Sequence, residues 1–128
     1  FVGLPYEPEF IKNPNILIFQ TFWLNEPDFN RPSHMSLQRG IDYIKRWEPL
    51  DVVYLTHISA SDIVDGDPSN NTPKKLACSK PLLSPATGAP YPTPCCQTDW
   101  EALAARIRKE FKIVCDILVP YDGLRITF

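Results

Sequence analysis

Two histidines, the only ones in the chain, carry most of the chemistry that this sequence offers. His34 lies in segment 32–36 (PSHMS), just before an amphipathic stretch, and His57 lies in segment 55–59 (LTHIS), at the end of an apolar run. A neutral imidazole is the commonest metal ligand and a frequent proton donor. The chain contains no glycine-rich phosphate loop, no His-Glu-x-x-His motif and no Gly-x-Ser-x-Gly motif. We therefore treat His34 and His57 as the candidate site, with structural histidines as the alternative.

Hydroxyl side chains flank both histidines. Ser33 and Ser36 surround His34, while Thr56 and Ser59 surround His57. A hydroxyl can orient an imidazole or donate to an oxyanion. Ser33 and Ser59 are accordingly predicted to contact the substrate.

The elements that must position the histidines are predicted from hydrophobic patterns. Segment 15–24 is β-branched and aromatic, which is typical of a strand covered on both faces, and segment 50–56 is a second such strand. Between them, apolar residues recur at helical spacing over 37–47, with Ser36 as the N-cap and Pro49 as the stop. The helix starts just after His34 and the next strand ends at His57, so we expect the two rings to converge at one edge of the sheet.

The second half of the chain begins with a long proline-rich stretch. Residues 61–97 show no clear period and are interpreted as an irregular insertion. A capping box formed by Thr98 and Glu101 then predicts a helix to about residue 111. Segment 113–119 is predicted as a third strand, and a turn at 120–123 leads to a short last strand over 124–128. The pattern β-α-β-insertion-α-β-β predicts one α/β domain over residues 1–128 with a mixed sheet and two main helices.

Composition limits the possible partners and compartments. A net charge of −2 gives no broad attraction to nucleic acid or to an anionic membrane, and no apolar run is long enough to span a bilayer. The four cysteines lack Cys-x-x-Cys pairs, so we interpret them as reduced thiols of an intracellular protein, cytoplasmic or organellar. Cys115 lies in an apolar run and is predicted to be a small buried hydrophobe.

Four segments resemble the C-terminal half of a metallo-β-lactamase-fold hydrolase. The resemblance is to the branch that contains the phosphonate-pathway cyclic phosphodiesterase, the tRNA 3′-processing endonuclease and relatives of the PQQ-synthesis protein B. The matching segments are the strand at 15–24, PSHMSL at 32–37, VYLTHIS at 53–59 and VPYDGLRI at 119–126. The implied fold is half of an αβ/βα sandwich.

The resemblance also implies roles for the two histidines. His57 corresponds to the last metal ligand, and His34 to a catalytic histidine that donates to the scissile phosphate or the leaving group. The implied reaction is the hydrolysis of a phosphate ester at a centre of two divalent metals, zinc or manganese, which neutralise charge on the phosphate oxygens.

The family's other ligands come from a His-x-His-x-Asp-His motif, and this chain has no such motif. A four-coordinate zinc cannot be held by His57 alone. The isolated chain is therefore predicted to be inactive and to hold at most a partial metal site. We expect it to associate with an N-terminal half or a partner chain that carries the missing ligands, because half of a sandwich would expose an apolar sheet face.

Two other kinds of protein fit the same sequence. One is a non-catalytic interaction module that retains the half-fold without metal. The other is an unrelated small α/β binding domain that uses the proline-rich stretch as its contact surface. The first predicts an unchanged partner function after His57→Ala, and the second predicts an independently folded monomer with a covered sheet.

Overall fold

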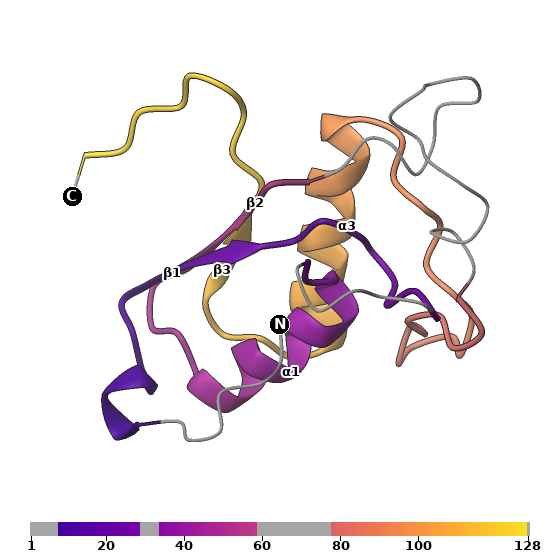
Figure 1. The fold of residues 1–128 in the computed structure, drawn as a ribbon, viewed down its shortest axis with the longest axis horizontal. Coiled ribbons are helices and arrows are strands. Elements are labelled where there is room, and N and C mark those ends of the chain that lie inside the picture. Colours follow the sequence, from indigo (N-terminus) through magenta and orange to yellow (C-terminus); the bar gives the residue numbers. More distant parts are fainter. Residues whose placement is uncertain (1–7, 29–33, 59–77, 128) are drawn as a thin grey trace.

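A computed structural model of the chain describes residues 8–28, 34–58 and 78–127. The elements in chain order are a short 3-10 helix (Glu9–Ile11), β1 (Ile16–Gln20), α1 (Leu37–Trp47), β2 (Val52–Thr56), α3 (Gln97–Glu110) and β3 (Asp116–Leu118). The three strands form one sheet in the order β1-β2-β3 (Figure 1). The predicted α/β class is confirmed.

The sheet is parallel, not mixed. β1 pairs with β2 in parallel and β2 pairs with β3 in parallel. β1 and β2 are each followed by a connection that contains a helix and returns the chain to the same edge, so successive strands run in the same direction. The predicted strand at 124–128 does not form within the described residues up to 127, where Arg125, Ile126 and Thr127 are exposed. In Figure 1 this yellow C-terminal segment extends away from both helices.

Helix α1 has the predicted bounds. The Ser36 hydroxyl accepts from the amide of Arg39 at 3.1 Å, which caps the first turn. The helix ends at Trp47. Its C-cap is Glu48, which has a left-handed backbone (φ 50°) and is followed by Pro49. Apolar residues at helical spacing are buried along one side, namely Leu37, Ile41, Ile44 and Trp47.

Helix α3 begins one residue before the predicted cap, so the capping box is wrong. Its first residue is Gln97, and Thr98 already lies inside the helix. The Asp99 carboxylate instead accepts from the amide of Cys95 at 2.8 Å, just outside the first turn. The apolar stripe of this helix is buried as predicted.

The core lies between the helices and one face of the sheet. Phe19, Val53, Leu55 and Ile117 point to this face from the three strands, and all are less than a tenth exposed. Helix α1 approaches β1 closely, because a Cβ at Gly40 would lie 2.5 Å from Cε1 of Phe19. Only glycine allows the helix and the aromatic ring to sit this close together.

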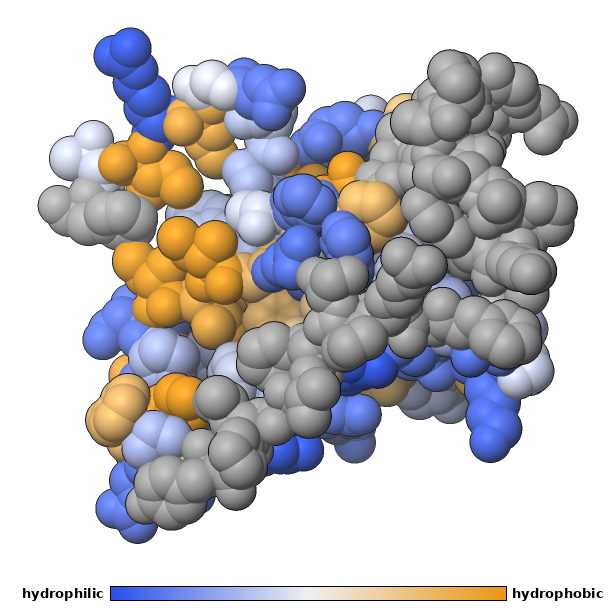
Figure 2. Space-filling view, in the orientation of Figure 1, coloured by the Kyte–Doolittle hydropathy of each residue, from blue (hydrophilic) through white to orange (hydrophobic). Residues whose placement is uncertain are grey.

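The other face of the sheet is open, and we call it the open face. The register places Ile18 of β1 opposite Tyr54 of β2, which in turn is opposite Leu118 of β3. Ile18 is 70% exposed and Leu118 is 47% exposed, so the prediction that β1 is covered on both faces is wrong for the described residues. In Figure 2, hydrophobic residues gather over the region where the strands lie in Figure 1.

The described part of the proline-rich stretch, residues 78–97, has little regular structure yet packs on the core. Its extended arms meet in one antiparallel bridge between Leu83 and Pro90. Leu82 and Tyr91 belong to the buried core, and Ser84 is 1% exposed. Residues 61–77 of the predicted insertion lie outside the described residues.

The burial of Cys115 agrees with its predicted role, whereas the intracellular compartment inferred from the cysteines stays a prediction. None of the four cysteines, which are Cys78, Cys95, Cys96 and Cys115, forms a disulfide. Cys115 is 3% exposed, and burial raises the pKa of its thiol. This side chain therefore acts as a small apolar core residue.

Candidate active site at the histidine pair

The two histidines lie at the carboxyl edge of the parallel sheet. β2 ends at Thr56, and His57 follows it directly. The chain just after β1 is hydrogen-bonded to two other segments. The Thr21 amide donates to the carbonyl of Thr56 at 2.8 Å, and the Phe22 amide donates to the carbonyl of Met35 at 2.8 Å. Residues 21–22 thus tie the end of β2 to the segment that carries His34.

This arrangement brings the two imidazoles together. Their ring centroids are 5.8 Å apart, with 38° between the ring planes. The expectation that the rings converge at one sheet edge is confirmed. The carboxyl edge of a parallel sheet is also where α/β proteins form their binding sites.

An aromatic side chain that sequence reasoning did not single out contacts both rings. The Phe22 centroid lies 4.4 Å from that of His34 and 5.4 Å from that of His57. Trp23 packs edge-on against Phe22 at 4.9 Å, and its ring lies 5.5 Å from the His34 ring. The buried indole N–H of Trp23 has no hydrogen-bond partner among the described residues. The signal in the sequence was the Phe-Trp pair directly after β1, which we interpreted only as strand.

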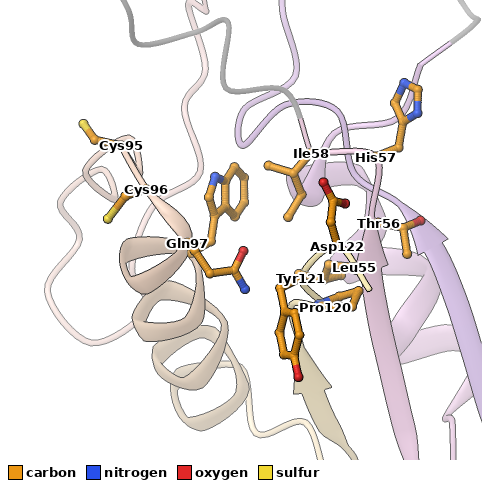
Figure 3. Close-up of a pocket in the computed structure, with 11 residues that line it drawn as sticks. Leu55, Thr56, His57, Ile58, Cys95, Cys96, Gln97, Pro120, Tyr121 and Asp122 are labelled. Atoms are coloured by element: carbon orange, nitrogen blue, oxygen red, sulfur yellow. The ribbon is translucent and has the colours of Figure 1, made fainter. Parts of the chain in front are cut away.

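His57 has an unusual backbone conformation. Its φ is 56°, in the left-handed region, while its side chain is exposed. Histidine is one of the few non-glycine residues that are enriched in this region. The turn at His57 ends the strand and directs the imidazole away from the core, as Figure 3 shows.

A polar cluster around Glu26 fixes the segment between β1 and α1. One carboxylate oxygen accepts from the Ser36 hydroxyl at 2.6 Å, and the other is paired with the guanidinium of Arg39. The amide of Glu26 donates to the side-chain oxygen of Gln38 at 2.8 Å. Because Ser36 is two residues from His34, this cluster anchors the N-terminal end of α1 and the segment that leads into it.

The predicted hydroxyl contacts are only partly described. Ser33 and Ser59 lie outside the described residues, so their predicted role in substrate binding stays a prediction. Ser36 is fully buried and committed to Glu26 and the helix cap, and the Thr56 hydroxyl lies 3.4 Å from the carbonyl oxygen of Phe19. Ser36 is therefore not available to orient an imidazole.

A pocket of about 410 Å³ opens beside His57, between β2 and the start of α3. Figure 3 shows Gln97 and Tyr121 facing each other across it, with the Asp122 carboxylate beside Ile58. The Gln97 amide nitrogen is fixed by the Val119 carbonyl at 2.7 Å and by Glu101. Residues 120–122, within the turn predicted at 120–123, thus form one wall of this pocket.

The described residues do not fit a two-metal centre by themselves. Within the described ranges, no group of three or more His, Cys, Asp or Glu side chains is placed to hold a metal ion. Asp122, Cys95 and Cys96 line the pocket beside His57, but they form no metal-holding group with it. Any further ligands would have to come from outside the described part of the chain.

Comparison with known proteins gives no relative for this chain: no family model, no curated protein and no solved structure matches it. The α/β fold and the histidine site are therefore inferred from this chain alone. In the described ranges, each helix is too short or too polar to cross a membrane.

Proposed function

We propose that this chain is the C-terminal half of a metal-dependent hydrolase of the metallo-β-lactamase fold, acting as a phosphodiesterase on a phosphate ester. The observation that supports the proposal best is the 5.8 Å separation of the His34 and His57 rings at the carboxyl edge of a parallel sheet. The motif resemblance of segments 32–37 and 53–59 assigns the two rings different roles.

In this proposal His57 is a metal ligand. Its exposed ring follows a left-handed turn at the strand end, so it is accessible to an ion held jointly with ligands from elsewhere. Two divalent ions, zinc or manganese, would neutralise charge on the phosphate oxygens when the domain is complete.

His34 is the catalytic histidine of the proposal. It is half-buried against Phe22 and Trp23, which limits the positions that its ring can take. A ring held next to the metal-ligand histidine can donate a proton or a hydrogen bond to a phosphate ester bound there. Ser33 and Ser59 remain the proposed substrate contacts.

The open face supports the proposed need for a second half. Ile18, Tyr54 and Leu118 form a row across all three strands on the side that neither helix covers. Exposed apolar surfaces of this kind mark interaction sites. We propose that an N-terminal half or a partner chain, carrying the His-x-His-x-Asp-His ligands, covers this surface.

The test uses the assembly recovered through an affinity tag on this chain, with bis(p-nitrophenyl) phosphate as substrate and Mn²⁺ or Zn²⁺ in the buffer. The isolated chain should not hydrolyse the diester, whereas the assembly should. His57→Ala should lower both metal content and activity. His34→Ala should retain the metal and lower kcat by about 10²–10⁴-fold, the usual contribution of a general acid. Asp42→Ala, on the exposed side of α1, is the matched control.

The competing possibility is an interaction module without catalysis, which the same open face favours. That module would leave the function of its partner unchanged after His57→Ala. Hydrolysis by the isolated chain with two bound metals would contradict the proposal of a half-domain, and an unchanged rate in His34→Ala would contradict the catalytic role.

A further inference from the structure

A second pocket, of about 500 Å³, lies at the amino end of the sheet, at the opposite end of the strands from the histidine pair. The segments that lead into all three strands line it, because Asn13 lies before β1, Leu50 before β2 and Cys115 before β3. We propose that this amino-end pocket binds a small alkyl monocarboxylate, with the alkyl chain inside and the carboxylate at two lysines. The proposal does not depend on the proposed phosphodiesterase function.

The lining of the amino-end pocket is largely aliphatic. Ile44 of α1 and Cys115 contribute buried surface, being 1% and 3% exposed, whereas Leu50 and Val114 are 55% and 86% exposed. A pocket of several hundred Å³ that is mainly apolar and carries a few polar groups is the usual form of a small-molecule site. An alkyl chain placed there would remove its own surface and that of the exposed residues from water.

Two lysines place positive charge at the same pocket. Lys45, near the end of α1, and Lys112, just after α3, both line it. The Lys45 ammonium lies 4.7 Å from the ring centroid of Phe111, another lining residue, so a cation–π contact holds this charge where the two helices end. Glu48 is the one carboxylate among the described lining residues. Two lysines against one carboxylate leave one net positive charge.

This lining selects the class of ligand. Phe111 is the one aromatic ring among the described lining residues, and its face already carries Lys45, so a flexible alkyl chain suits the aliphatic remainder better than a second ring does. A single carboxylate matches the one net positive charge. A doubly charged phosphate would be repelled by Glu48 and only half compensated by the net charge.

Titration of the chain with sodium octanoate, below its micelle concentration, tests the proposal by NMR. The alkyl protons should give nuclear Overhauser effects to the methyl groups of Ile44 and Ile113. Hexanoate should bind more weakly, by up to about fourfold for each methylene removed, because burial of each methylene contributes to the affinity. Octylamine has the same chain with the opposite charge and should bind more weakly than octanoate.

Charge-changing variants test the recognition of the carboxylate. Lys45→Met should weaken octanoate binding by about two- to fivefold, as expected for an ion pair that is partly exposed to water. Glu48→Gln should strengthen binding by a similar factor, which general damage to the fold would not do. Lys109→Met is the matched control, because Lys109 is exposed on α3 and does not line the pocket. Circular dichroism verifies that each variant is folded.

Val114→Glu tests the position of the ligand. Its exposure predicts an intact fold, while the added carboxylate at the pocket should weaken octanoate binding. Unchanged affinity in the folded Val114 variant, or equal binding of octanoate and octylamine, would overturn the proposal. The same holds if octanoate does not bind, or if its chain contacts Ile18 and Leu118 of the open face in place of the pocket.

Discussion

At the scale of single residues, His57 combines a left-handed backbone with an exposed side chain. Histidine, like asparagine and aspartate, enters the left-handed region more often than most L-residues, whereas a β-branched residue there is a genuine outlier. The φ of 56° is not required by core packing, because the side chain is exposed. Asn13, Glu48 and Lys112 have a similar φ, so what distinguishes His57 is its exposed ring next to His34 at the sheet edge.

The left-handed backbone of His57 gives a stability prediction. His57→Asn should keep the free energy of unfolding within about 0.5 kcal/mol, the range for neutral surface changes. His57→Val should lower it by about 1–2 kcal/mol, because a β-branched side chain is disfavoured in the left-handed region. Urea unfolding monitored by tryptophan fluorescence measures both.

Gln20→Val is the control for that comparison, because Gln20 is exposed in the extended backbone of β1, where valine is favoured. It should be neutral or slightly stabilising. Equal destabilisation by valine at both positions would show that the left-handed turn carries no strain.

At the scale of elements, a polar network joins α3 to the proline-rich stretch. Glu110 accepts from the Ser84 hydroxyl at 2.6 Å and from Arg106 at 2.6 Å, and it also pairs with the hydroxyl of Tyr91. These hydrogen bonds lower the pKa of Glu110 to about 2, and burial together with Glu110 raises the pKa of Tyr91 to about 12. The network explains why residues 84–91 pack on the core although they form no regular strand or helix.

This network predicts how the stability of the folded chain changes at low pH. The pKa of Glu110 is lower in the folded chain than in the unfolded chain, so its contribution is complete above about pH 4.5 and is lost as the pH falls towards 2. Glu110→Gln should lower the melting temperature at pH 6 and should flatten its decline between pH 4.5 and 2. Thermal melts followed by circular dichroism across this range provide the measurement.

The control for the network is Glu101→Gln, because Glu101 is exposed and accepts from Gln97 within its own helix. Its acid profile should follow that of the unsubstituted chain. If Glu110→Gln and the unsubstituted chain declined in parallel down to pH 2, the network would not be coupled to folding.

At the scale of the whole molecule, the two faces of the sheet differ in cover. Phe19, Val53 and Ile117 are buried under the helices, whereas Ile18 and Leu118 are exposed on the open face. Both helices lie on one side, because the buried residues of α1 and α3 belong to one core with those of the strands. In the proposed assembly, a second half would cover the open face and remove this difference between the two faces.

Substitutions on the two faces should therefore have opposite consequences. Ile18→Lys with Leu118→Lys should change the free energy of unfolding of the isolated chain by less than about 0.5 kcal/mol, as expected for exposed positions. The same change should abolish recovery of the proposed partner in affinity purification. Phe19→Lys, one residue away on the covered face, should unfold the chain.

The amount of co-purified protein measures partner binding. Urea unfolding measures the stability of the isolated chain. Retention of the partner by the doubly substituted open face would contradict the proposed docking of a second half there. A large loss of stability in the isolated chain would show that the open face is covered by the chain itself.

The sequence determined the local elements and the chemistry available to them. The 3.6-residue apolar period and the Ser36 cap set the bounds of α1, because both depend only on neighbouring residues. The buried stripe of α3 was predictable for the same reason. The start of α3 was not, because a competing carboxylate at Asp99 satisfied the amide of Cys95.

Only the tertiary structure decided how these elements combine. The parallel direction of all strands, the open face and the contact of Phe22 with both imidazoles depend on residues far apart in the chain, and no local pattern encodes such contacts. Two histidines separated by a helix and a strand were visible in the sequence. Their meeting at 5.8 Å required the hydrogen bonds that join residues 21–22 to the end of β2 and to Met35.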